Sequence, residues 1–284
     1  MVDKALDVKD KITKGIFPPH FLYGGIKLEK QKKAKIIESN IKNIFNLKKG
    51  DIVVTNRLKY ILLMKILRRK SILINMNSNH DLTKKSGLKN KLIYAFNKLS
   101  YLACSHVVCL SKIQLSKLKN VGVKRASAIP LGVEKSLVDA VKKSKEYFLS
   151  SGFDKGKNYG FIKKALKNEK IKILDGKNPL TYVEYLKVLG KAKAIVFNID
   201  VTKENSSDLS GTTTCFETLL MKKPIFINDQ PWLKELYKKN YYIYKNEEDL
   251  RKIINKKINF QELDYSYLTL ENFTKELAKI IKRL

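Results

Sequence analysis

The first half of the chain alternates short apolar runs with amphipathic stretches. The apolar runs are rich in Ile, Val and Leu and predict buried strands, whereas the stretches between them have helical spacing. This alternation is typical of βαβ units that build a parallel sheet. The predicted strands are 51–54, 71–75, 106–110 and one that ends at Gly132, and the predicted helices are 27–46, 57–69, 88–103 and 111–119.

The alternation restarts after a basic, weakly patterned stretch, Lys135–Lys145, which we expect to be a linker. The sequence therefore predicts an α/β protein of two doubly wound Rossmann-like domains that face each other across a cleft. We place these domains at 1–138 and 139–284, with the last helix able to pack back on the first domain. The strands predicted for the second half are 147–150, 171–174, 194–197, 224–227 and 241–244, and the helices are 157–167, 180–190, 212–221, 231–238 and further helices up to Leu284.

Length and apolar content exclude several classes of protein. The chain has 284 residues, of which 44% are hydrophobic, so it can bury a substantial core and is not a disordered chain. No apolar run is long enough to span a bilayer, and the charged first residues lack the pattern of a signal peptide. Cys104, Cys109 and Cys215 lie in apolar segments without metal-ligand spacing. We therefore expect a cytoplasmic protein with no disulfide, no metal and no cofactor.

The net charge of +31 favours an anionic partner, either a nucleic acid or an anionic membrane. Only six of the 58 basic residues are arginines, although the arginine fork is the group that binds phosphates with defined geometry. Lysine is abundant together with Ile and Asn, as in a compositionally biased genome. We therefore do not expect a nucleic acid to be a partner.

The basic excess is concentrated in the first half, where residues 1–140 carry 29 basic and 9 acidic side chains. Two stretches there, 57–69 and 88–103, are both cationic and amphipathic. Such helices either lie on an anionic bilayer or face the core with a solvated basic side, and the sequence leaves both open. An anionic surface on the inner face of the membrane, with the protein bound peripherally, is thus one candidate partner.

One segment of the second half has the features of a phosphate site. Ser210, Gly211 and Thr212 open a predicted helix, where backbone N–H groups and the positive end of the helix dipole suit a phosphate. Thr213 and Glu217 are four residues apart and share one face of that helix, opposite its apolar face. We expect this face to line the cleft, with Glu217 accepting hydrogen bonds from a pair of sugar hydroxyls. The alternative is a capped helix whose Glu217 is solvated.

Two further loops carry candidate residues. Lys155 and Lys157 lie among glycines between a predicted strand and a helix, which suits a diphosphate, although the spacing is not that of a P-loop. The polar loop after strand 71–75 contains His80 and Asp81. Among the three histidines, His80 is the best placed to act in a cleft, with a purely structural role as the alternative.

Five motifs in this order resemble the GT-B glycosyltransferases of the retaining, glycogen-synthase and lipid-mannosyltransferase kind (glycosyl transferases group 1, family 4). Together they extend roughly over residues 17–257. The motifs are Pro18–Gly25, Ser111–Gly132, Lys157–Asn158 followed by Ala165, Ala192–Phe197, and Glu217 followed by Lys223-Pro224-Ile-Phe-Ile.

The resemblance implies a GT-B fold whose C-terminal domain holds a nucleotide-sugar donor. It implies that Glu217 binds the ribose hydroxyls and that the turn of Ser210, Gly211 and Thr212 faces the diphosphate. Lys157 matches the lysine that neutralises the leaving diphosphate, an electrostatic role that grows as the sugar departs.

The N-terminal domain contributes the remaining residues that the resemblance implies. His80, with Asp81 beside it, lies where the family places a histidine or aspartate close to the transferred sugar. Gly24 and Gly25 match the family's glycine loop over the phosphates.

Two positions depart from the family's pattern. Leu209 stands where the first Glu of the E-x7-E motif is expected, and Gly152 stands where an arginine is expected. Lys155 is a candidate substitute for that arginine.

The leading interpretation is a hexosyltransferase that moves a sugar from a UDP- or GDP-linked donor to a glycan, lipid or protein acceptor. The resemblance implies transfer without a metal ion and with retention of anomeric configuration. Two alternatives stay open. One is a GT-B-fold UDP-sugar epimerase, since such enzymes carry a similar Ser-Gly turn, and the other is a degenerate, non-catalytic basic binding protein.

Overall fold

The structure is a computed structural model, and it divides the chain into two compact units. Unit 1 comprises residues 1–9, 24–130 and 273–284, and unit 2 comprises residues 10–23 and 131–272. The main division thus follows Pro130 rather than Val138. The residues that the structure describes are 5–18, 25–30, 44–75, 86–152, 156–177, 180–200, 211–230, 232–233, 240–256 and 260–284.

Unit 1 contains a parallel sheet of four strands in the order β1-β2-β3-β4. The strands are β1 (Ile52–Thr55), β2 (Lys70–Asn75), β3 (His106–Cys109) and β4 (Ala126–Ala128). Strands β2 and β3 are almost continuously buried, as expected for the centre of a parallel sheet with helices on its faces.

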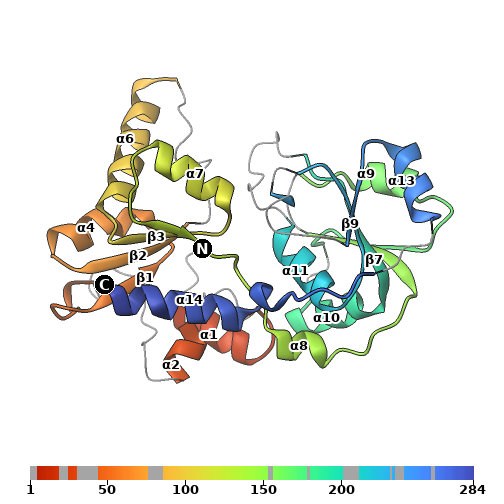
Figure 1. Cartoon of the computed structure of the whole chain (residues 1–284), viewed down its shortest axis with the longest axis horizontal. Coiled ribbons are helices and arrows are strands. Elements are labelled where there is room, and N and C mark those ends of the chain that lie inside the picture. Colours follow the sequence, from red (N-terminus) through yellow and green to blue (C-terminus); the bar gives the residue numbers. More distant parts are fainter. Residues whose placement is uncertain are drawn as a thin grey trace. The chain divides into compact units, whose positions relative to one another are not determined.

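Helices α4, α6 and α7 cover one face of this sheet, and α14 runs along the other (Figure 1). A core of apolar side chains, among them Ile61, Leu73, Val107 and Leu118, fills the space between these three helices and the strands. The bounds are α1 (Ala5–Thr13), α2 (Gly25–Lys30), the 3-10 helix η2 (Leu58–Tyr60), α4 (Ile61–Ile66), α6 (Leu88–Ala103), α7 (Lys112–Asn120) and α14 (Leu270–Arg283).

Unit 2 contains a parallel sheet of five strands in the order β6-β5-β7-β8-β9. The chain goes from β5 outward to β6 and then returns to place β7 on the other side of β5. Neighbouring strands β5 and β7 therefore mark a topological switch point, and open α/β sheets bind their ligands beyond the carboxyl ends of the strands at such a point. The bounds are β5 (Tyr147–Ser151), β6 (Ile171–Leu174), β7 (Ala192–Phe197), β8 (Ile225–Asn228) and β9 (Tyr241–Tyr244).

Helices α9 and α13 cover one face of the unit 2 sheet, and α10 and α11 lie on the other (Figure 1). Phe148, Val196, Phe226 and Leu250 belong to the core on the α9 side. The bounds are α8 (Lys135–Asp139), α9 (Tyr159–Ala165), α10 (Tyr182–Lys191), α11 (Thr212–Leu220), α13 (Glu247–Ile254) and the 3-10 helix η3 (Ser266–Leu268).

The expected linker Lys135–Lys145 was wrong in its first part, because Lys135–Asp139 forms helix α8. Val138 is fully buried, and Lys135 and Asp139 form an ion pair one helical turn apart. The burial of Val138 and this ion pair stabilise a helix whose five residues are too few to show a recognisable helical periodicity.

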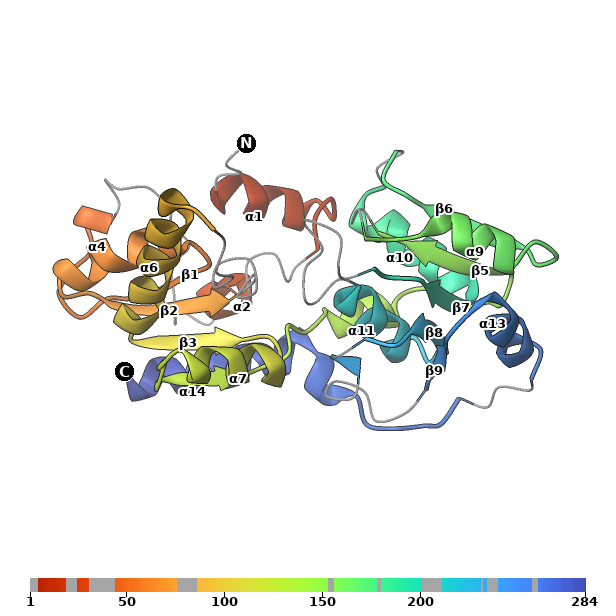
Figure 2. The ribbon, with the colours of Figure 1, turned by 90° about the horizontal axis from the view of Figure 1, so that it is seen from above.

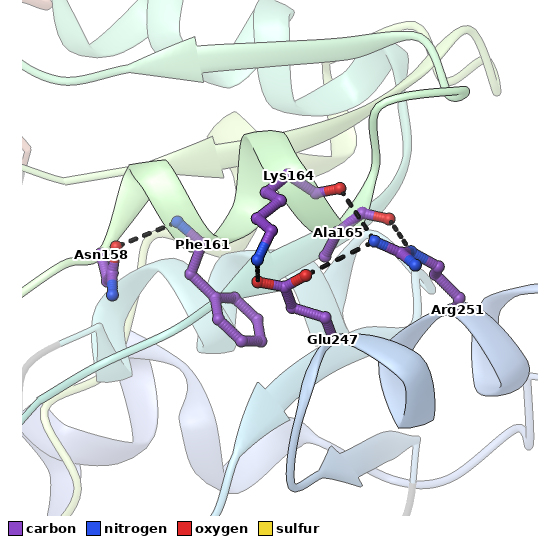
Figure 3. A network of polar contacts seen from close by, with 6 residues as sticks. All are labelled: Asn158, Phe161, Lys164, Ala165, Glu247 and Arg251. Atoms are coloured by element: carbon purple, nitrogen blue, oxygen red, sulfur yellow. Dashed lines mark hydrogen bonds and ion pairs between the residues drawn. The ribbon is translucent and has the colours of Figure 1, made fainter.

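Polar contacts hold α9 in place against α13 (Figure 3). Arg251 donates to the carbonyl oxygens of Ala165 (3.0 Å) and Lys164 (3.2 Å), which are left open at the end of α9. Glu247 pairs with both Lys164 and Arg251. At the other end of α9, the Asn158 side chain caps the helix by accepting from the N–H of Phe161 at 3.0 Å. The start of α9, directly after Lys157, is therefore fixed.

The three cysteines of the chain are buried in the described residues. Cys104, Cys109 and Cys215 are buried free thiols, and burial raises the pKa of Cys104 and Cys109 to about 12. Thiols of this kind are inert packing groups. Within the described ranges, no helix is both long enough and apolar enough to cross a bilayer.

Candidate functional site

The topological switch point of unit 2 brings two of the predicted residues together. Lys157 follows β5 and forms an isolated antiparallel bridge with Ile199, just beyond β7. Its Nζ lies 4.4 Å from the centroid of the Phe197 ring. Gly211 lies beside the same two residues, since a Cβ on it would lie 3.2 Å from Ile199 Cδ1 and 3.8 Å from Phe197 Cε2. Lys157 and Gly211 therefore both lie against the end of β7.

Lys157 is a buried cation with an exposed fraction of only 9%. Its ammonium group donates to the backbone oxygen of Ser151 and lies over Phe197, so a cation–π contact offsets part of its lost hydration. Gly152 has φ +134°, and a Cβ at this position would lie 1.9 Å from Lys157 Nζ. The position where the resemblance expects an arginine is thus a glycine for a steric reason: the lysine amino group occupies that space.

Helix α11 presents its positive end at the same place. Its N-cap, Gly211, adopts a left-handed conformation with φ +83° and has no side chain of its own that could cap the helix. The first turn contains no acidic residue, so the dipole is not neutralised by the helix's own carboxylates. Thr212 is buried, whereas Thr213 is half-buried. The end of α11 can therefore accept an anion beside a buried cation.

The expected orientation of Glu217 was wrong. Its side chain neither lines an open face nor is solvated, because the residue is 2% exposed. Its two carboxylate oxygens accept hydrogen bonds from the hydroxyls of Tyr182 and Tyr185, each at 2.8 Å. Thr213 and Glu217 do lie one helical turn apart, but α10 covers the face of α11 on which Glu217 lies.

The tyrosines and the carboxylate shift one another's acidity. Burial raises the pKa of Glu217 to about 7, although the hydrogen bonds from Tyr182 and Tyr185 lower it. Burial and the neighbouring Glu217 raise the pKa of both tyrosines well above the usual value. Near neutral pH, Glu217 is thus a group poised between its two protonation states.

Tyr182 and Tyr185 are not among the site residues predicted from the sequence. A signal was available, because the two are three residues apart and so share one face of the predicted helix 180–190. The sequence pattern does not show which helix faces these tyrosines. Tyrosine rings are also largely apolar, so the pattern fits ordinary core residues equally well.

Among the remaining predicted site residues, Gly25 begins helix α2 in unit 1. Outside the described residues lie His80, Asp81, Gly24, Lys155 and Ser210.

Comparisons of the sequence with protein-family models and with curated protein sequences give no match. Solved structures, in contrast, are similar to this chain. HepE from Anabaena, solved in complex with UDP and glucose, has a TM-score of 0.59 at 13% identity, over 86% of this chain and 80% of that one. TarM has a TM-score of 0.59 at 12% identity, over 88% of this chain and 59% of that one.

At such low identity the likeness concerns the fold. Two parallel sheets, each with helices on its faces and one with a switch point at β5 and β7, agree with the predicted architecture. The chain has the α/β fold of the GT-B glycosyltransferases.

Proposed function

We propose that the protein is a glycosyltransferase that takes its sugar from a nucleotide-sugar donor. The observation that carries the proposal is that a buried lysine, Lys157, and the N-terminus of α11 lie against the same end of β7, at the switch point of unit 2. In α/β sheets this is the place where nucleotides bind.

The donor diphosphate would lie against Gly211, Thr212 and Thr213. Backbone N–H groups at the start of a helix point at a bound phosphate, and Gly211 has no side chain to hold it away. Lys157 would balance the charge that develops on the diphosphate as the sugar leaves. A lysine and a helix N-terminus together carry this charge, so we propose transfer without a metal ion.

Glu217 has a different part in this proposal from the one first expected. With both oxygens bonded to tyrosines of α10, it holds α11 in position behind the phosphate site. Contact with a ribose would require the sugar hydroxyls to replace the tyrosine hydroxyls.

The similarity to HepE, which was solved with UDP and glucose, supports UDP as the first nucleotide to test. A glycan, lipid or protein acceptor and retention of configuration stay predictions from the sequence.

The test is nucleotide binding by the whole chain. Thermal unfolding is measured with UDP, GDP, CDP, dTDP and ADP and with their common sugar conjugates. A ligand at about 100 times its Kd adds about 2.7 kcal/mol to stability, which gives a readable rise in Tm. We expect one base to stabilise selectively. If no nucleotide stabilises the protein, the proposal is wrong.

A lysine variant then tests the phosphate site. Lys157→Met keeps the length of the side chain but removes its charge, and should weaken binding of the diphosphate about tenfold or more while leaving the nucleoside almost unaffected. Lys163→Met is the matched control, since Lys163 is an exposed residue of α9 just beyond the proposed site. Equal losses in both variants would contradict the assignment of Lys157. Released nucleoside diphosphate, measured with candidate acceptors, then tests transfer itself.

A further inference from the structure

Helix α6 of unit 1 turns its apolar side to the solvent. Most of the large hydrophobic side chains that are exposed among the described residues belong to this one helix. We name five of them the α6 stripe: Leu88 (75% exposed), Leu92 (63%), Phe96 (42%), Leu99 (57%) and Leu102 (45%).

The stripe is a continuous band on the helix surface. At about 100° per residue these side chains fall within an arc of about 120°, and 16 residues extend over about 24 Å. A contiguous apolar patch of this kind marks an interaction surface, whereas scattered exposed leucines do not.

The opposite side of α6 supplies the contacts with the fold, and it is aromatic and polar. Tyr101 is 1% exposed and its hydroxyl donates to Asn75 Oδ1 of β2 at 3.0 Å. Ser100 is fully buried, and its hydroxyl donates to the carbonyl oxygen of Phe96, one turn earlier in the same helix, at 2.9 Å. Figure 2 shows α6 on the side of the unit 1 sheet that also carries α4. The most deeply buried residues of α6 are therefore Ser100 and Tyr101, which lie outside the stripe.

The charged side chains of the helix that carries the stripe are all of one sign. Helix α6 carries Lys89, Lys91 and Lys98 and no acidic residue. The same holds for a longer segment of the sequence, since residues 82–133 contain ten basic side chains and no acidic one. Lysines beside an apolar arc can extend their stems along a lipid surface and place their charges among phosphates.

A basic hollow adjoins the end of the stripe. It has a volume of about 350 Å³, and Leu102 of the stripe contributes to its wall. Its cations are Lys65, Lys124 and Arg125, and its lining contains no acidic residue. A ligand with a phosphate next to an apolar chain would pair with the cations of the hollow and pack against the apolar side chains of the stripe.

We propose that the α6 stripe docks on an anionic phospholipid bilayer, with the leucines in the interfacial region and a lipid phosphate in the basic hollow. The charges decide between occupants. A second copy would bring an equally basic face against this one, and like charges oppose that contact. A nucleic acid would satisfy the lysines but would leave the leucines in water. An anionic bilayer satisfies both groups at once.

The test is co-sedimentation of the whole chain with vesicles, without nucleotide, so that its result does not depend on the proposed transferase activity. Vesicles of phosphatidylcholine alone are compared with vesicles that also contain phosphatidylglycerol. We expect binding to the anionic vesicles, weakened by added salt. Equal partition into both kinds of vesicle, or into neither, would overturn the proposal.

Variants then separate the two parts of the surface. The double variant Leu92→Ser with Phe96→Ser should lower partition into anionic vesicles about a hundredfold, since each side chain loses about half the transfer energy of a buried apolar residue. Leu180→Ser, at an exposed leucine of unit 2, is the matched control and should bind as the unchanged protein does.

Charge reversal tests the lysines. Lys91→Glu should lower partition at low salt about tenfold or more, because it removes one attraction and adds a repulsion. Lys163→Glu in unit 2 is its control and should have a much smaller effect. If the stripe variants bind vesicles normally, or if light scattering shows a dimer that Leu92→Ser with Phe96→Ser dissolves, the stripe is not a membrane surface.

Discussion

The buried carboxyl of Glu217 should make the stability of unit 2 depend on pH. Its folded pKa of about 7 lies above the ordinary value of a glutamate carboxyl, 4.5, so folding favours the protonated form. The stabilising contribution is therefore complete below about pH 4.5 and is lost as the pH rises toward 7. Above that pH it no longer changes.

The size of the effect follows from the shift. A difference of about 2.5 pKa units corresponds to about 3 kcal/mol between the two ends of the window. Glu217→Gln keeps the shape of the side chain and cannot ionise. Its carbonyl oxygen can accept from one tyrosine hydroxyl, while its amide donates to the other. The variant should match the unchanged protein near pH 4.5 and exceed it by about 3 kcal/mol near pH 7.5.

The assay is urea unfolding at several pH values, followed by fluorescence of Trp232. This residue is the only tryptophan, lies in unit 2 and is 1% exposed, so its emission reports unfolding of the unit that contains Glu217. Comparing the two proteins at each pH removes the background from all other titrating groups. Glu262→Gln, at an exposed acid of unit 2, should leave the profile unchanged.

A stability difference that stays constant from pH 4.5 to 7.5 would refute the reasoning. It would mean that Glu217 ionises in the folded protein as it does in the unfolded chain, and hence that the tyrosine hydrogen bonds fully offset the cost of burial.

Three glycines give further predictions, each checked by urea unfolding. Gly132→Ala should cost about 3 kcal/mol or more, because its Cβ would lie 2.1 Å from the backbone of Thr269, which cannot move cheaply. Gly160→Ala, inside α9 with nothing closer than 3.5 Å, should instead stabilise by up to about 1 kcal/mol. Gly152→Ala should cost about 1–3 kcal/mol through backbone strain and should also displace Lys157, so its diphosphate affinity should fall with its stability. A Gly152→Ala protein with unchanged stability and affinity would contradict this account.

The sequence by itself predicted where the regular elements lie. Helix α6 was predicted at 88–103 and strand β6 at 171–174, and both have these bounds in the structure. Such elements are readable because periodicity is a local property: apolar side chains recur at the spacing that one face of a helix or a buried strand requires. The start of α11 at Gly211 is also local, since it depends on the residues next to it.

Only the tertiary structure decided which faces meet. Glu217 pairs with tyrosines 32 and 35 residues away in the sequence, and no local pattern tells which helix will cover it. The strand order that places β5 beside β7, and with it Lys157 near Gly211, is likewise a contact between distant segments. Helix α6 is a second example. Its amphipathic pattern was clear from the sequence, but the exposure of its apolar side was not. A hydrophobic pattern shows that a helix or strand has an apolar face. Which element packs against that face depends on contacts between segments that are distant in the sequence.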